Sequence, residues 1–160
     1  MDLFEKYYTL CLRYLSLRQR SEKEIADYLK KKKTPDEIIV LIVTKLKKQK
    51  FLDDGLFARM WIEARSRGKP RSKWLLTREL REKGVSQEII EKTLSLSSEV
   101  ASDLSLAKDA IEKRILKFKD APRQEVYQRV GGFLARRGFN WETSKRAIDD
   151  LLKEGYNREE

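Results

Sequence analysis

The chain has 160 residues, a formal net charge of +10, 39% charged residues, no histidine and a single cysteine, Cys11. The absence of histidine excludes a zinc site built from Cys and His and any catalytic dyad that uses imidazole. One cysteine excludes a disulfide within the chain, and its leucine neighbours predict a small buried thiol. No apolar stretch reaches the roughly 18 residues that a membrane span needs, and the first residues do not resemble a signal peptide. We therefore expect a cytoplasmic protein.

Helical spacing of apolar residues predicts a series of short helices and no strands. The first helix is expected over about residues 3–17, and Ser21 with Glu24 forms a capping box that opens the second, which runs to about residue 32. Thr34 is expected to cap the third helix, with proline and two acidic residues in its first turn. The apolar run over residues 38–43 could form a buried strand by composition, but the capping signal before it favours a helix.

Six more helices are expected further along the chain. Gly84 and Gly138 are well placed as C-caps, and Pro122 breaks the chain between two helices. Trp74 and Trp141 could stack on nucleic-acid bases, but their helical spacing with leucine neighbours favours a place in the core. The first of these helices is expected over about 53–67. The second is marked by Trp74, Leu75, Leu76 and Leu80 and ends at Gly84, and the third starts at Ser86 and carries Ile89, Ile90 and Leu94. The last three are expected over about 99–117, 123–137 and 140–152.

The nine helices form three groups of three, and the second and third helices of each group repeat in register. A shift of 51 residues places Ser21 on Ser72, and a shift of 54 places Gly84 on Gly138. The first helices align only after a change in loop length. We predict an all-α protein of three tandem three-helix repeats (1–50, 51–97 and 98–160) that form an elongated, curved array.

Two features depart from a simple repeat. Lys33 stands in the first repeat where the later repeats have glycine, so the end of that helix is expected to close differently. Gly131 and Gly132 lie inside a predicted helix, at a cost of about 1 kcal/mol each relative to alanine. A close crossing of two helices would explain them.

Basic residues are concentrated in the segment from Arg65 to Lys83, which has eight cations against two acids. Several of these cations lie in a turn, where no helix dipole favours them, and arginine offers two-pronged contacts to phosphate or carboxylate. The run from Lys30 to Lys33 is instead expected to be a solvated face. The candidate contact residues are Arg65, Arg67, Lys69, Arg71, Lys73, Arg78, Arg81, Arg129, Arg136 and Arg137.

Each of the three repeats carries a distinctive run of residues. The first repeat carries Leu12-Arg13-Tyr14-Leu15 and, after it, Arg18-x-x-Ser21-x-x-Glu24-Ile25. The second carries Phe51-Leu52-Asp53-Asp54-x-x-Phe57-Ala58, then Arg67-Gly68-Lys69-Pro70 and Arg78-Glu79-Leu80-Arg81-x-Lys83-Gly84-Val85. The third carries Phe133-Leu134-Ala135-Arg136-Arg137-Gly138-Phe139. Together these motifs resemble the RecX family, and the resemblance covers residues from about 5 to 153.

The resemblance implies a regulatory protein that modulates RecA recombinase, mostly by inhibition, through binding to the RecA–DNA filament. It implies neither a catalytic residue nor a cofactor, and we expect a monomer whose partners are RecA and nucleic acid. The alternative that the residues leave open is a DNA-binding protein that acts alone through a basic helical surface. An enzyme is the third hypothesis: Asp53-Asp54 and Asp149-Asp150 could hold a metal, but acidic pairs are common at helix starts and on solvated faces.

Overall fold

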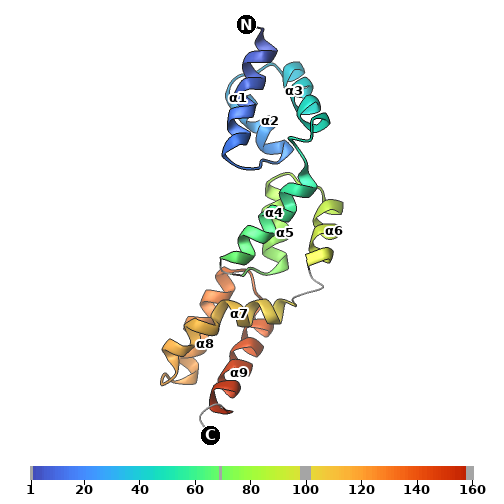
Figure 1. Cartoon of the computed structure of the whole chain (residues 1–160). Helices are drawn as coiled ribbons and strands as arrows, with labels where there is room; N and C mark the ends of the chain where they lie inside the picture. Colours follow the sequence, from blue (N-terminus) through green and yellow to red (C-terminus); the bar gives the residue numbers. More distant parts are fainter. Residues whose placement is uncertain (1, 69, 98–101, 158–160) are drawn as a thin grey trace. The chain divides into compact units, whose positions relative to one another are not determined.

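The computed structural model describes residues 2–68, 70–97 and 102–157, and its secondary structure is entirely helical (Figure 1). Over these residues there are nine α-helices, one short 3₁₀-helix and no strand, which confirms the all-α prediction. The helices are α1 (Leu3–Leu17), α2 (Glu22–Lys31), α3 (Asp36–Lys48), α4 (Asp54–Arg67), α5 (Lys73–Glu82), α6 (Gln87–Ser97), α7 (Asp103–Ile115), η1 (Leu116–Phe118), α8 (Arg123–Arg136) and α9 (Trp141–Asn157). None of the described helices is both long and apolar enough to cross a membrane.

The described residues form two compact units. The first consists of Met1–Trp61 with Glu79–Thr93, and the second of Ile62–Arg78 with Leu94–Glu160. The boundary falls inside α4, inside α5 and inside α6, so the repeat predicted at 51–97 contributes to both units. Residues 1, 69, 98–101 and 158–160 lie outside the described part of the chain.

The core of the first unit lies between α1, α2 and α3. Cys11 is fully buried there beside apolar side chains of α2 and α3, which confirms the predicted buried thiol. Burial raises the pKa of the Cys11 thiol to about 11, because the thiolate loses its solvation. Each buried Leu or Ile contributes about 1.5–3 kcal/mol, and this core holds Ile25, Leu29, Ile39, Ile42, Leu46 and Leu52.

The second unit has its core between α7, α8 and α9. Gly131 of α8 is buried where this helix passes Trp141, and a Cβ atom at Gly131 would lie 3.0 Å from Cζ3 of the indole ring. The expected close approach is therefore present at Gly131. At Gly132 a Cβ atom would meet only the guanidinium of Arg136, at 3.5 Å.

The starts of the early helices follow the sequence signals only in part. The capping box is present at α2: Glu24 N donates to Ser21 Oγ, and Ser21 N donates to the Glu24 carboxylate. Thr34 does not cap α3, so that prediction is wrong. Pro35 occupies the N-cap position, and Thr34 Oγ1 is buried without a hydrogen-bond partner.

The end of α2 also differs from expectation. Lys33 has φ 58°, which is the left-handed conformation of Gly84 and Gly138. Lys33 N donates to Lys30 O at 2.9 Å, and the next amide donates to Leu29 O at 3.1 Å, as in the other two repeats. The helix therefore closes in the same way. A lysine fits at position 33 because its side chain is exposed to solvent. A Cβ atom at Gly84 or Gly138 would instead contact a neighbouring helix.

The prediction that two tryptophans lie in the core is wrong. Trp74 and Trp141 are 62% and 55% exposed. Each lies in the first turn of its helix, outside the buried stripe that follows, for example at Leu76 and Leu80 of α5. Trp141 still packs its ring edge against Tyr127, with 5.9 Å between the ring centroids.

Candidate functional site

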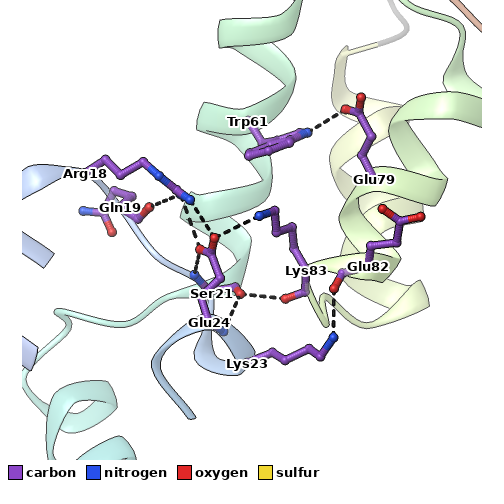
Figure 2. A network of polar contacts seen from close by, with 9 residues as sticks. All are labelled: Arg18, Gln19, Ser21, Lys23, Glu24, Trp61, Glu79, Glu82 and Lys83. Carbon is purple, nitrogen blue, oxygen red and sulfur yellow. Dashed lines mark hydrogen bonds and ion pairs between the residues drawn. The ribbon is translucent and has the colours of Figure 1, made fainter. Parts of the chain in front are cut away.

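In the first unit, the start of α2 is bound to the turn between α5 and α6 (Figure 2). Ser21 Oγ donates a hydrogen bond of 2.6 Å to the carbonyl oxygen of Lys83, and Lys23 Nζ donates one of 3.0 Å to that of Glu82. Gly84 follows with φ 79°, and a Cβ atom there would lie 2.5 Å from Cβ of Lys23. We call this arrangement the first junction.

Carboxylates neutralise the cations of the first junction. Glu24 pairs with Lys83 at 3.1 Å and with Arg18 at 2.6 Å (Figure 2). Burial raises the pKa of the Glu24 carboxyl. Hydrogen bonds from Arg18, the Ser21 amide and Lys83 lower the pKa by more than burial raises it, so the pKa lies below its ordinary value. A second acid, Glu79, accepts a hydrogen bond of 2.8 Å from the indole N–H of Trp61.

The second unit contains a similar junction one repeat later, in which a backbone amide takes the place of the serine hydroxyl as the donor. Ser72, the residue before α5, donates its backbone N–H to the carbonyl oxygen of Arg137 at 3.2 Å. Gly138 has φ 84°, and a Cβ atom there would lie 2.6 Å from Ser72 Oγ and 2.7 Å from Cβ of Leu75. This second junction therefore joins the start of α5 to the turn between α8 and α9.

An aspartate supports each junction from the first residue of a helix. The amide of Glu22 donates to Asp54 Oδ1 at 2.9 Å, and the amide of Lys73 donates to Asp103 Oδ1 at 3.3 Å. The two aspartates are 49 residues apart, and the same shift places the buried pair Ala58 and Ile62 on the buried pair Ala107 and Ile111. The first helices of the second and third repeats therefore align with this shift, which the sequence reasoning did not find.

Arginines gather at the second junction. The guanidinium carbons of Arg114 and Arg137 lie 4.0 and 4.5 Å from the centroid of the Phe133 ring. Burial lowers the pKa of Arg137, and the positive charges of Arg71, Arg114 and Arg136 lower it further. The Nε atom of Arg137 is also buried without a hydrogen-bond partner. We call Arg71, Arg114, Arg136 and Arg137 the arginine cluster.

The structure thus brings three of the predicted contact residues together: Arg71, Arg136 and Arg137. It adds Arg114, which the sequence reasoning did not select. The shift of 49 residues matches Arg114 to Arg65, which was already a candidate. This correspondence is the feature of the sequence that could have identified Arg114.

The other candidates do not join this cluster. Arg67 and Arg129 each form an ion pair with a glutamate one turn earlier on the same helix. Arg81 donates two hydrogen bonds to Gln87, and Arg78 lies over the ring of Trp74 at 5.8 Å. Arg65 lies near the end of α4, Lys73 begins α5, and Lys69 is outside the described residues.

The acidic pairs make structural contacts. Asp53 Oδ1 accepts the amide of Leu56 at 3.0 Å at the start of α4, and Asp54 binds the amide of Glu22. Asp149 accepts from Tyr127 and pairs with two cations, while Asp150 pairs with Lys108 at 3.0 Å. Within the described part of the chain, no group of three or more His, Cys, Asp and Glu residues could hold a metal ion.

The repeated junctions and the helical composition define a class of protein: a tandem array of three-helix modules, each with a glycine or lysine in the left-handed conformation after its second helix. Family models of three RecX domains match the chain in order. The first three-helix domain matches residues 8–49, the second 53–94 and the third 101–148. The chain belongs to the RecX family.

Individual relatives agree with this assignment. A "Regulatory protein RecX" of Streptomyces lividans is 28% identical over 96% of this chain and 81% of its own length. One from Bacillus pumilus is 34% identical over 99% of this chain, which spans only 59% of that relative. A solved "regulatory protein RecX" is 26% identical with a TM-score of 0.73, covering 92% of this chain and 72% of that one. The RecX structure from Lactobacillus salivarius, 22% identical with a TM-score of 0.76 over 94% of this chain and 97% of that one, supports the fold alone.

Proposed function

We propose that this chain is a non-enzymatic regulator of the RecA recombinase. It binds the RecA–DNA filament in the cytoplasm, mostly inhibits RecA, and so regulates recombination and DNA repair. The observation that carries this proposal is the match of three RecX domains, in order, over residues 8–148. Relatives with similar sequences are named regulatory proteins, and that name supports a regulatory role here.

The charge of the chain suits such a partner. A net charge of +10 favours association with a surface that combines DNA phosphates and protein acids. Repeated modules offer several contacts to successive subunits of a helical polymer. Weak contacts of this kind add through effective concentration, so no single high-affinity site is required.

The filament-facing surface that we propose consists of the basic residues between Arg65 and Arg81, together with Arg129, Arg136 and Arg137. Replacing Arg67, Lys69, Arg71 and Lys73 with alanine should weaken filament binding at least tenfold, about 1.4 kcal/mol. The matched control replaces the four exposed lysines of the run Lys30–Lys33 with alanine. Equal loss in both quadruple variants would mean that charge acts diffusely, and loss in the control alone would place the surface in the first repeat.

The test of the function itself is the ATPase activity of RecA on single-stranded DNA, titrated with this protein. We expect the activity to fall as the protein approaches a stoichiometric amount. No change at stoichiometric excess would contradict a role in RecA regulation. If the protein then bound naked DNA with the same salt dependence, the alternative of a DNA-binding protein acting alone would be favoured.

A further inference from the structure

The first junction shows which face of a repeat receives the following one. Ser21 at the start of α2 binds the carbonyl oxygen of Lys83 (Figure 2), and the amide of the next residue, Glu22, binds Asp54. Lys47, near the end of α3, lies 3.1 Å from the Glu22 carboxylate. The start of the second helix and the end of the third helix therefore form one docking face, on which the first residues of α4 lie.

The corresponding face of the third repeat contains a pocket. The registers of 51 and 54 residues, applied in turn, match Ser21 to Val126 and Lys47 to Leu152. Val126 and Leu152 both line a pocket of about 560 Å³, which is within the range of about 300–1,000 Å³ that is usual for ligand sites. The other residues of the lining are Phe118, Lys119, Ala121, Arg123 and Lys153.

The start of α8 differs from the start of α2 in one respect. α8 begins at Arg123, one helical turn before Tyr127, which is the residue matched to Glu22. Glu22 is the first residue of its helix, so its amide is available to bind Asp54. Tyr127 lies inside α8, where its amide belongs to the helix. A further repeat could not form the amide contact of the first junction here, so a partner docks through the pocket itself.

The pocket combines apolar and basic side chains. Four residues of the lining are apolar and buried or half-buried, and the other three are exposed cations. None of the described lining residues is acidic, although Asp149 pairs with Arg123 from outside the lining at 3.2 Å. A ligand that matches both kinds of side chain carries an apolar group beside a carboxylate.

We propose that this pocket binds an acidic helix start of a protein partner, which places an apolar side chain in the pocket and a carboxylate near its cations. The proposal goes beyond the proposed function, because it requires a protein segment of this chemistry but does not require RecA.

The chain itself contains a segment of this chemistry on the equivalent face. Leu52-Asp53-Asp54-Gly55-Leu56-Phe57-Ala58 runs into α4 and has two acids among apolar residues, of which Leu52, Phe57 and Ala58 are buried. The same segment in a second copy is already docked on its own first repeat, so a second copy does not offer it. A nucleic-acid backbone matches the cations but presents no apolar side chain to the pocket.

The test uses this segment as the probe. A synthetic peptide of residues 52–58, acetylated and amidated at its ends, is titrated into the ¹⁵N-labelled full chain, and the backbone amides are followed by NMR. Lys153→Glu reverses one cation of the pocket. The matched control is Lys48→Glu, because Lys48 is the exposed residue at the same register position on α3, in the repeat whose face already holds α4. Both variants change the net charge equally, and their spectra show whether they are folded.

We expect saturable shifts at the amides of residues 118–126 and 152–153 in the wild type. Lys153→Glu should weaken binding about tenfold, because a favourable charge contact becomes a repulsive one, and Lys48→Glu should change it by less than about twofold. A peptide with Asp53→Asn and Asp54→Asn and a peptide with Phe57→Ala should each bind at least about fivefold more weakly, because each lacks one of the two required groups.

Four results would overturn the proposal. The first is a wild-type pocket whose amides do not shift with the peptide, and the second is equal affinity of the Lys153→Glu and Lys48→Glu variants. The third is a shift of these amides by oligothymidylate but not by the peptide, which would make a nucleic acid the occupant. The fourth is a dimer in sedimentation that Lys153→Glu dissociates, which would make a second copy the occupant. No measurement contains RecA, so a failure of the proposed function would leave them unaffected.

Discussion

The substitution Gly138→Ala tests whether the second junction is closely packed. Gly138 follows α8 with φ 84°, and a methyl group there would lie 2.6 Å from Ser72 Oγ and 2.7 Å from Cβ of Leu75. Both neighbours are close to the backbone of α5, so they cannot move away without shifting the helix. The new methyl group would therefore force the start of α5 away from the turn.

Two terms set the size of the effect. A left-handed backbone costs a residue with a Cβ atom about 1–2 kcal/mol, and overpacking of a close contact costs about 1–3 kcal/mol. Together they predict a loss of about 2–5 kcal/mol in the free energy of unfolding, against a typical total of about 5–15 kcal/mol. For a chain of this length that corresponds to a melting temperature lower by about 4–20 °C.

The assay is thermal unfolding followed by circular dichroism at the helix band. Gly155→Ala is the matched control: Gly155 lies in α9 with nothing within 4 Å of a new Cβ, and alanine there should leave stability unchanged or raise it by up to about 1 kcal/mol. The reverse change, Lys33→Gly, should raise stability by relieving the left-handed lysine. Equal melting temperatures for the Gly138→Ala and Gly155→Ala variants would refute the close-packed junction.

Three further predictions concern the first unit. The Cys11 thiol, with its pKa raised to about 11 by burial, should react with iodoacetamide at pH 8 only after unfolding; rapid labelling of the native chain would contradict its burial. Glu24→Gln should lower stability at pH 7, because a carboxyl whose pKa is lowered by folding stabilises the protein above its ordinary pKa. The difference from the wild type should shrink as the pH falls from about 4.5 through the lowered pKa; a pH-independent difference in denaturant midpoint would exclude this linkage. A fragment of residues 51–160 should melt below the full chain, because it lacks the partners of Lys83 and Asp54 in α2, and an unchanged melting temperature would contradict that dependence.

Much of the helical architecture could be predicted because its signals are local. Apolar spacing and caps such as Ser21 with Glu24 act within a few residues, and the bounds of most helices follow from them. Thr34 shows the limit of this reasoning: its sequence context is that of a cap, yet Pro35 takes the N-cap position. Trp74 shows a second limit. Apolar spacing predicts which face of a helix is buried, but it does not predict whether a residue in the first turn is covered by a neighbouring element.

The site was predicted less completely, because its residues come from separate helices. Counting cations selected Arg71, Arg136 and Arg137, but also Arg67 and Arg129, whose charge is paired with a glutamate on the same helix. No count along the chain could place Arg114 over Phe133. Only the packing of α7 against α8 does that, and it depends on contacts remote in sequence.

Comparing repeats within one chain separates what the fold needs from what it does not. Both junctions keep a serine before the helix, a glycine in the left-handed conformation and an aspartate that accepts the first helical amide. Those features recur because the backbone contacts require them. Glu24, which pairs with Lys83 in the first junction, is replaced by Leu75 in the second, where Ser72 still binds the carbonyl oxygen of Arg137. Docking of the helix therefore does not depend on that carboxylate.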